Sequence, residues 1–230
     1  AGAFHSFDPA TYGYNNLPAY LIVDSQYRGR YPIASVMPGD PSPADEVRRV
    51  QVIRDVIGPD IKLMCDINQG WRPEQAIDIG NRVEEVGLFW LEDVTRADDY
   101  QGLARVTKSL KTPIAGGEYL YGIAPFNQMI QAHSVDIIMV DIIRAGGVTQ
   151  WMKIAGMAEA ANLPIVSHVM PEILVHVVAA CPNGLTVEYM PWMLELFEET
   201  PEIIDGELVL PNKPGLGLKF DEKAVALFKA

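Results

Sequence analysis

Short apolar runs alternate with longer amphipathic stretches over most of the chain. The runs are rich in Leu, Ile and Val, which is typical of strands covered on both faces. The stretches between them repeat apolar residues every three or four positions, as helices with one buried side do. The predicted strands are residues 17–25, 31–37, 61–65, 88–91, 113–115, 136–140, 164–167 and 185–187. The predicted helices are residues 43–57, 73–86, 98–109, 124–132, 148–161 and 172–180.

Alternating strands and helices of these lengths predict a parallel α/β fold. About eight strands in a chain of 230 residues favour a TIM-type barrel over an open sheet. The connection between the first two predicted strands is too short for a parallel crossover, which needs a dozen residues or more. Either the barrel lacks its first helix or residues have been lost there, and we favour the loss.

The last thirty residues have a different pattern. They predict a hairpin around Asp205-Gly206 and a final helix from Asp221. We therefore divide the chain into an N-terminal remnant with the first barrel strand (1–30), the barrel (31–200), and a C-terminal hairpin and helix (201–230).

Three successive predicted strands end in a carboxylate. Asp66, Glu92 and Glu118 follow one another at intervals that suit one βα unit. In a barrel those strand ends meet at one mouth, where active sites are built. Three converging carboxylates raise each other's pKa unless a hard cation such as Mg²⁺ lies between them. A single strand-end acid is more often a helix cap or a solvated loop residue, but three in register favour a metal site.

The later strands end in further reactive groups. Asp141 and His168 end neighbouring strands, so a hydrogen bond between them is geometrically easy. Such an aspartate fixes the imidazole tautomer and raises its basicity. Glu188 ends the last strand at the same mouth, where an apolar site could keep it protonated as a hydrogen-bond donor.

Charge and composition narrow the range of partners. The chain has 30 acidic and 18 basic residues and a net charge of −12, which argues against nucleic acid and anionic membranes. A small anionic substrate remains compatible, because a bound metal reverses the local field. No apolar run is long enough to span a membrane, and no signal-peptide pattern opens the chain. Cys65 and Cys181 are the only cysteines, which fits a reducing, cytoplasmic setting.

The ordered motifs at barrel spacing resemble the enolase superfamily, in particular its mandelate racemase subgroup and the galactarate/talarate type of acid-sugar dehydratase. The resemblance covers residues 41–228. The stretches that carry it are DINQGW, GGEYL, IIRAGGVTQW, SHVMPE, VEYMPWMLELF and PGLGL. It implies a (β/α)₇β barrel, the C-terminal domain of that superfamily, with the N-terminal capping domain largely absent.

The resemblance also implies an activity and a site. The activity is that of a Mg²⁺-dependent lyase, which dehydrates an acid sugar, a small 2-hydroxy carboxylate, through an enediolate. A homo-oligomer is implied as well. The implied roles are metal ligands for Asp66, Glu92 and Glu118, a general acid/base for His168 paired with Asp141, stabilisation of the enediolate for Glu188, and substrate contacts for Asn68 and Arg144.

One departure from the family keeps alternatives open. The family carries Lys-x-Lys on the second barrel strand, where this chain has Ser35 and Met37. Neither side chain can abstract a proton as lysine can, so His168 is left as the single general acid/base. The alternatives are a racemase or epimerase of a 2-hydroxy acid, a barrel that binds metal and ligand without catalysis, and a structural scaffold without metal.

Overall fold

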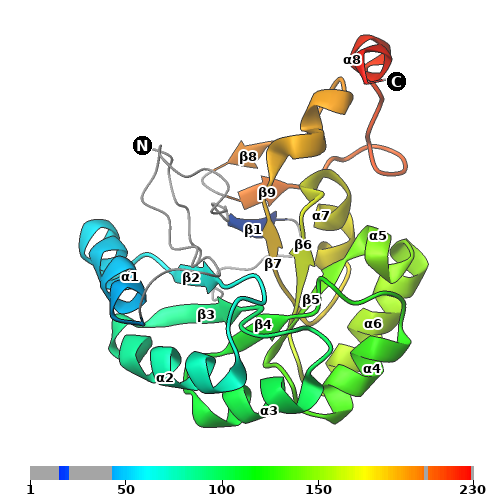
Figure 1. Cartoon of the computed structure of the whole chain (residues 1–230). Helices are drawn as coiled ribbons and strands as arrows, with labels where there is room; N and C mark the ends of the chain where they lie inside the picture. Colours follow the sequence, from blue (N-terminus) through cyan, green and yellow to red (C-terminus); the bar gives the residue numbers. More distant parts are fainter. Residues whose placement is uncertain (1–15, 21–42, 205–206, 229–230) are drawn as a thin grey trace.

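The computed structural model describes residues 16–20, 43–204 and 207–228. Within these residues, strands β2 to β7 pair in chain order and in parallel to form one curled sheet (Figure 1). Strand β1 pairs in parallel with β7 and antiparallel with β9, so the C-terminal hairpin extends the same sheet. The strands are β1 (Asn16–Tyr20), β2 (Leu63–Asp66), β3 (Leu88–Glu92), β4 (Ile114–Gly116), β5 (Ile137–Asp141), β6 (Ile165–His168), β7 (Gly184–Glu188), β8 (Ile203–Ile204) and β9 (Glu207–Val209).

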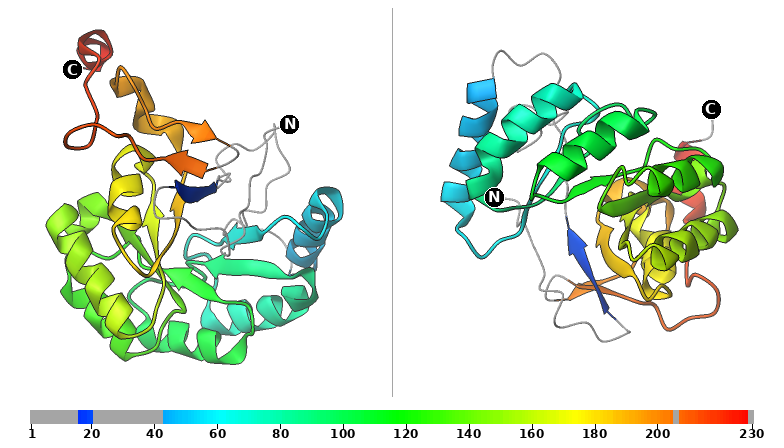
Figure 2. Two further views of the ribbon diagram at one scale, coloured as in Figure 1. Left: turned by 180° about the vertical axis from the view of Figure 1, so that it is seen from behind. Right: turned by 90° about the horizontal axis from the view of Figure 1, so that it is seen from below.

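Helices cover the convex face of the curled sheet, as expected for parallel βα units (Figures 1 and 2). The last helix, α8 (Glu222–Leu227), lies away from the curled sheet and next to η4 (Pro191–Leu196) (Figures 1 and 2). The helices are α1 (Pro43–Ile57), α2 (Pro73–Val83), η3 (Glu84–Val86), α3 (Tyr100–Ser109), α4 (Ala124–Gln131), α5 (Ile142–Ala145), α6 (Val148–Ala160), α7 (Pro171–Ala179), η4 (Pro191–Leu196) and α8 (Glu222–Leu227). Across the described ranges, none of these helices combines the length and apolarity needed to cross a bilayer.

The predicted order of strands and helices is confirmed wherever the structure describes the chain. Two local differences have clear causes. Helix α5 was not predicted, and it forms because the Asp141 carboxylate accepts the N–H groups of Ile143 and Arg144 and so caps a single turn. The predicted helix over 73–86 changes to a 3₁₀ turn at Glu84, and Gly87 ends it with a left-handed φ of 70°.

The barrel prediction is confirmed in its coarser form, a curled parallel sheet with outer helices, which is a partial TIM barrel. No pairing within the described ranges joins β2 to β1. The strand predicted for residues 31–37 lies outside those ranges, as do residues 21–25 of the first predicted strand. The closed (β/α)₇β barrel and the three-part division of the chain therefore stay predictions.

Side-chain alternation along the strands sets the position of the site. One face of the sheet packs against the helices, with Leu91 and Ile138 fully buried there. The opposite face carries a smaller apolar cluster that includes Trp90, Met139 and Val166. Since strand side chains alternate, the residues two positions later project from that same inner face at the carboxyl ends of the strands. Those residues are Glu92, Asp141 and His168.

Gly117 joins β4 to the acid that follows it and has a backbone that only glycine adopts easily. Its φ is +128°, and an added Cβ would lie 2.6 Å from the Met139 carbonyl oxygen. We expect Gly117→Ala to lower the free energy of unfolding by at least about 2 kcal/mol, because strain and a backbone clash add. Urea unfolding in the presence of EDTA measures this loss.

The matched control is Gly156→Ala on the exposed side of α6, where nothing lies within 4 Å of the added carbon. It should raise stability by about 0.5–1 kcal/mol, the usual helical gain of alanine over glycine. Equal stability of the two variants would contradict the predicted role of Gly117.

Candidate active site

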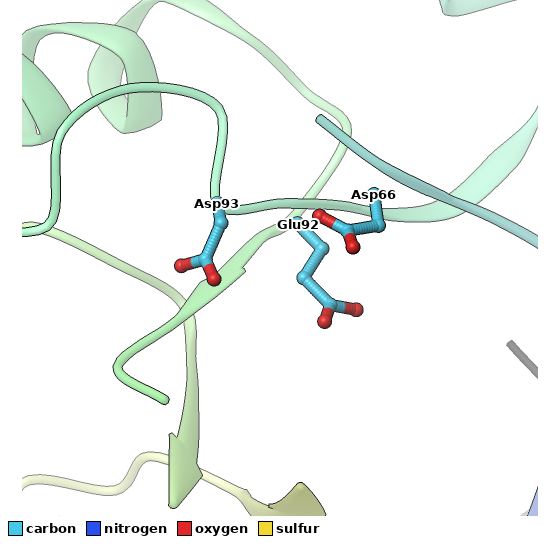
Figure 3. A group of neighbouring side chains, drawn as sticks. All are labelled: Asp66, Glu92 and Asp93. Atoms are coloured by element: carbon cyan, nitrogen blue, oxygen red, sulfur yellow. The ribbon is translucent and has the colours of Figure 1, made fainter. Parts of the chain in front are cut away.

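Three acids converge at the carboxyl ends of β2 and β3. Asp66 and Glu92 are direct register neighbours, and Asp93 follows Glu92 in the chain. One carboxylate oxygen of each lies within 4.8 Å of the others, close enough to share a metal ion (Figure 3). The sequence predicted Asp66 and Glu92 here but missed Asp93. The sequence pointed to Asp93 only in that it follows Glu92 directly. Alternation along a strand would place two consecutive acids on opposite faces.

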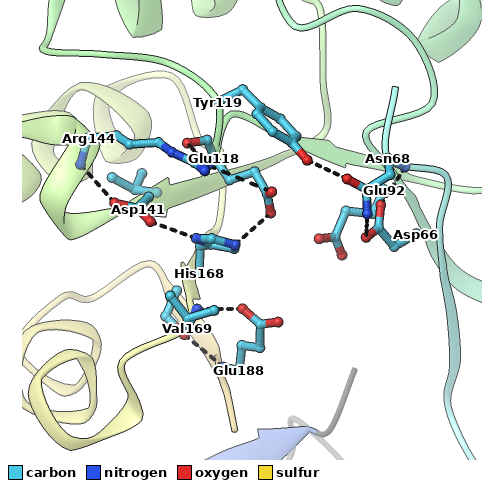
Figure 4. Close-up of polar contacts among 12 residues, drawn as sticks. Asp66, Asn68, Glu92, Glu118, Tyr119, Asp141, Arg144, His168, Val169 and Glu188 are labelled. Carbon is cyan, nitrogen blue, oxygen red and sulfur yellow. Dashed lines mark hydrogen bonds and ion pairs between the residues drawn. The ribbon is translucent and has the colours of Figure 1, made fainter. Parts of the chain in front are cut away.

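Glu118, the third predicted ligand, lies beside this group but turns its carboxylate toward His168 (Figure 4). Its Oε2 is 3.2 Å from His168 Nε2, and its Oε1 is 3.9 Å from an Arg144 guanidinium nitrogen. Burial raises its pKa, and the charge of Asp93 raises it further. Glu118 therefore belongs to the same electrostatic cluster, and its ligand role stays a prediction.

The buried acids destabilise one another in their charged forms. The pKa of Glu92 is raised well above its ordinary value by burial, then by the charges of Asp66, Glu118 and Glu188. Burial and the charge of Asp66 raise the pKa of Asp93 in the same way. Such a set of hard oxygen donors fits a divalent cation like Mg²⁺ or Mn²⁺ better than a soft metal.

The predicted Asp141–His168 hydrogen bond is confirmed. The two residues are register neighbours on β5 and β6, and His168 Nδ1 lies 2.8 Å from Asp141 Oδ2 (Figure 4). Burial by itself would lower the pKa of His168, but the hydrogen bond to Asp141 and the charges of Glu118 and Glu188 outweigh it, so the pKa is raised. The imidazole is thus held between the carboxylates of Asp141 and Glu118. Its Nε2 faces the acid cluster, which consists of Asp66, Glu92, Asp93 and Glu118.

Glu188 ends β7 and reaches the same space (Figure 4). Its Oε2 accepts the Val169 N–H, and its own N–H donates to Ser167 Oγ at 2.7 Å. Burial raises its pKa to about 7, although His168 and the Val169 N–H act in the opposite direction. A pKa in this range leaves the protonated form populated near neutral pH, in line with the predicted ability to donate a hydrogen bond.

The two predicted substrate-binding residues are linked by a tyrosine that the sequence did not single out. Asn68 donates to Asp66 Oδ2 at 2.9 Å and accepts a hydrogen bond from the Tyr119 hydroxyl. The Arg144 guanidinium lies 4.9 Å from the centroid of the Tyr119 ring and donates to the Glu118 carbonyl at 3.0 Å. Tyr119 thus connects both residues across the site (Figure 4). An aromatic residue beside a strand-end acid usually packs in a core, so nothing in the sequence indicated Tyr119 as a site residue.

Comparison with known proteins agrees with this geometry. Residues 23–224 match the family described as Enolase C-terminal domain-like. The chain is 33% identical over 186 residues to L-talarate/galactarate dehydratase of Salmonella typhimurium, covering 81% of this chain and 47% of that protein. The chain belongs to the enolase superfamily.

Solved structures of superfamily members show the same fold. The L-talarate dehydratase of Polaromonas sp. JS666, complexed with Mg and L-glucarate, superposes with a TM-score of 0.85 at 30% identity, over 92% of this chain and 64% of that one. A racemase from Streptomyces coelicolor with bound magnesium gives a TM-score of 0.84 at 26% identity, over 96% of this chain and 64% of that one. This superfamily chain spans about half the length of the Salmonella enzyme that it matches.

Ser35 and Met37, which the sequence predicts at the positions of the superfamily's second-strand lysines, lie outside the described residues. Among the residues that the structure describes, His168 is the histidine that contacts the acid cluster.

Because the pKa of Glu188 is raised, we expect the free energy of unfolding to depend on pH. The folded chain holds this proton more tightly than the unfolded chain, whose glutamate has its ordinary value of 4.5. The stabilisation is complete below about pH 4.5 and is lost as the pH rises through 7. Glu188→Gln does not titrate, so its stability relative to the wild type should rise by up to about 3 kcal/mol between pH 4.5 and 8.

Denaturant unfolding of both proteins in EDTA, at several pH values, measures this difference. A stability difference that stays constant over the whole pH range would show that folding does not raise the pKa of Glu188.

Proposed function

We propose that the chain carries the active site of a Mg²⁺-dependent dehydratase that acts on an acid sugar, a small 2-hydroxy carboxylate. The observation that supports this most strongly is the place of His168. One ring nitrogen is held by Asp141, and the other faces the acid cluster. A general acid/base is thereby fixed beside a site suited to a cation that binds carboxylates.

Asp66, Glu92 and Glu118 would hold the ion through carboxylate oxygens. Bound there, Mg²⁺ would stabilise the negative charge that develops on the substrate carboxylate when the α-proton leaves. The Salmonella and Polaromonas relatives, named for this chemistry, support the choice of reaction.

His168 would move the proton in both halves of the reaction. As the neutral base it would take the α-proton at Nε2, and as the acid it would return that proton to the departing β-hydroxyl, so that water leaves and a double bond forms. Asp141 would keep Nδ1 protonated and orient the ring, because it accepts that hydrogen bond at 2.8 Å. One base suffices for this sequence, which is consistent with Ser35 and Met37 on the second predicted strand.

Three further residues would bind the substrate and its developing charge. Protonated Glu188 would donate a hydrogen bond to the substrate carboxylate, since its pKa of about 7 leaves that form populated. Arg144 would pair with a second carboxylate or hydroxyl of the acid sugar, and Asn68 would donate to a hydroxyl. A homo-oligomer and a cytoplasmic location stay predictions alongside this one.

The proposal predicts the effect of His168→Asn. The purified protein with Mg²⁺ is screened against a library of acid sugars, and product is followed by NMR. The variant should lose about 10²–10⁴-fold in kcat, the usual contribution of a general acid/base. His133→Asn is the matched control, because His133 is exposed and has a φ of 53°, which asparagine tolerates. Turnover that survives in His168→Asn would remove the assigned role.

A racemase or epimerase is the second candidate, favoured by the likeness to the Streptomyces racemase. Reaction in deuterium oxide separates the two activities. A racemase would return deuterated substrate in both configurations, whereas a dehydratase would give an unsaturated product or its keto form.

Binding without catalysis is the remaining alternative with a metal. Calorimetry that shows binding of an acid sugar, together with no product by NMR, would favour it. A thermal stability that neither EDTA nor Mg²⁺ changes would instead favour a scaffold without metal.

A further inference from the structure

Asp93 lies in the acid cluster although it directly follows β3, where continued strand alternation would turn its side chain away. It directly follows Glu92, and alternation would place the two carboxylates on opposite faces of the sheet. Its φ of 41° breaks the alternation and brings both side chains to the same side (Figure 3). We propose that Asp93 is a further ligand of the divalent cation at this site, in addition to Asp66, Glu92 and Glu118. This inference rests on the proposed function.

The backbone of Asp93 is fixed on both sides in this strained conformation. Its N–H donates to the Ala115 carbonyl at 3.0 Å, and its carbonyl accepts the Gln69 N–H at 2.6 Å. A left-handed backbone at a residue other than glycine costs of order 1 kcal/mol or more, and such strain is concentrated at functional sites. Here its result is a carboxylate within 4.8 Å of the Asp66 and Glu92 oxygens.

One oxygen of Asp93 is left for a ligand. The carboxylate accepts the Gly117 N–H, but Oδ2 is buried and has no hydrogen-bond partner. The residue is only 3% exposed. A buried carboxylate oxygen without a partner carries a desolvation cost that a bound cation would remove.

The charge of Asp93 also acts on the other acids. Among the neighbouring charges it has the largest effect on Glu118, whose pKa it raises. A residue needed only to accept the Gly117 N–H could be an asparagine, which would avoid this repulsion. A charged carboxylate at position 93 is favourable if it binds a divalent cation together with the other acids.

Titration calorimetry with MgCl₂ tests the proposal on four proteins: the wild type, Asp93→Asn, Asp66→Asn and Asp98→Asn. Asparagine at 93 keeps an oxygen for the Gly117 N–H and removes the charge. Asp98 is the matched control, since it lies five residues on, is exposed and forms a surface ion pair with Arg96. Asp93→Asn should weaken Mg²⁺ binding by roughly 10- to 100-fold relative to Asp98→Asn.

Thermal melts with and without Mg²⁺ separate ligation from a purely structural role. In EDTA, Asp93→Asn should be at least as stable as the wild type, because one repelling charge is gone, while the Mg²⁺-induced rise in Tm should shrink. An equal loss of Tm under both conditions, with unchanged Mg²⁺ affinity, would overturn the proposal. If Asp66→Asn alone loses the ion, the proposed function stands and the role of Asp93 falls. If the wild type binds no Mg²⁺, both fall.

A second measurement uses the wild-type chain and does not depend on how a variant folds. Anomalous diffraction from crystals soaked in MnCl₂ locates the ion. The proposal expects Asp93 Oδ2 at a bonding distance of about 2.0–2.6 Å, and an ion bound to the other acids with Asp93 more than about 3.5 Å away would overturn it.

Discussion

Mutual repulsion among buried carboxylates is the physical constraint that the strand-end site must satisfy. Glu92, Asp93 and Glu118 are all buried, and each has its pKa raised by burial and by acidic neighbours. Parallel strand register brings Glu92 and Glu118 to one edge of the curled sheet, where the carboxyl ends of β3 and β4 meet, and a left-handed backbone angle brings Asp93 to the same place. Bound protons or a positive charge relieve this repulsion. In the described structure His168 contacts both Glu118 and Asp141, and it offsets part of their charge when its imidazole is protonated.

The site is also supported by backbone groups of the loops that follow the strands. Asp141 caps a one-turn helix while it holds His168, so the orientation of the imidazole is tied to the folding of that turn. The Val169 N–H holds Glu188 in a similar way, and Val169 itself has a φ of 44°, an unusual conformation for a β-branched residue. Hydrogen bonds to backbone N–H groups thus hold Asp141 and Glu188, which would take part in the proposed chemistry.

Much of this arrangement could be predicted because strand periodicity is simple. The repeated spacing of Asp66, Glu92 and Glu118 indicated that they share one edge, and the order of Asp141 and His168 indicated a hydrogen bond that the structure contains. The position of Asp93 could not be predicted in this way, since it follows from one left-handed backbone angle.

Other features depend on contacts between loops. Tyr119 and Asn68 are 51 residues apart in the chain and meet only through the loops that follow β4 and β2. The direction of the Glu118 side chain likewise depends on two contacts. One is with His168 on β6, and the other is with Arg144 on the short helix α5. Periodicity specifies which strand end a residue occupies, but not which neighbour its side chain contacts.

The most direct test of the account is the number of protons released when Mg²⁺ binds. A carboxyl group with a raised pKa keeps its proton up to a higher pH, and a metal that binds its oxygens must displace any proton that it holds. Titration of the wild-type chain with MgCl₂ at pH 7, in buffers of different ionisation enthalpy, gives that number. The account predicts saturable binding with net proton release that decreases as the pH is raised. Binding without proton release at any pH, or no binding at all, would contradict it.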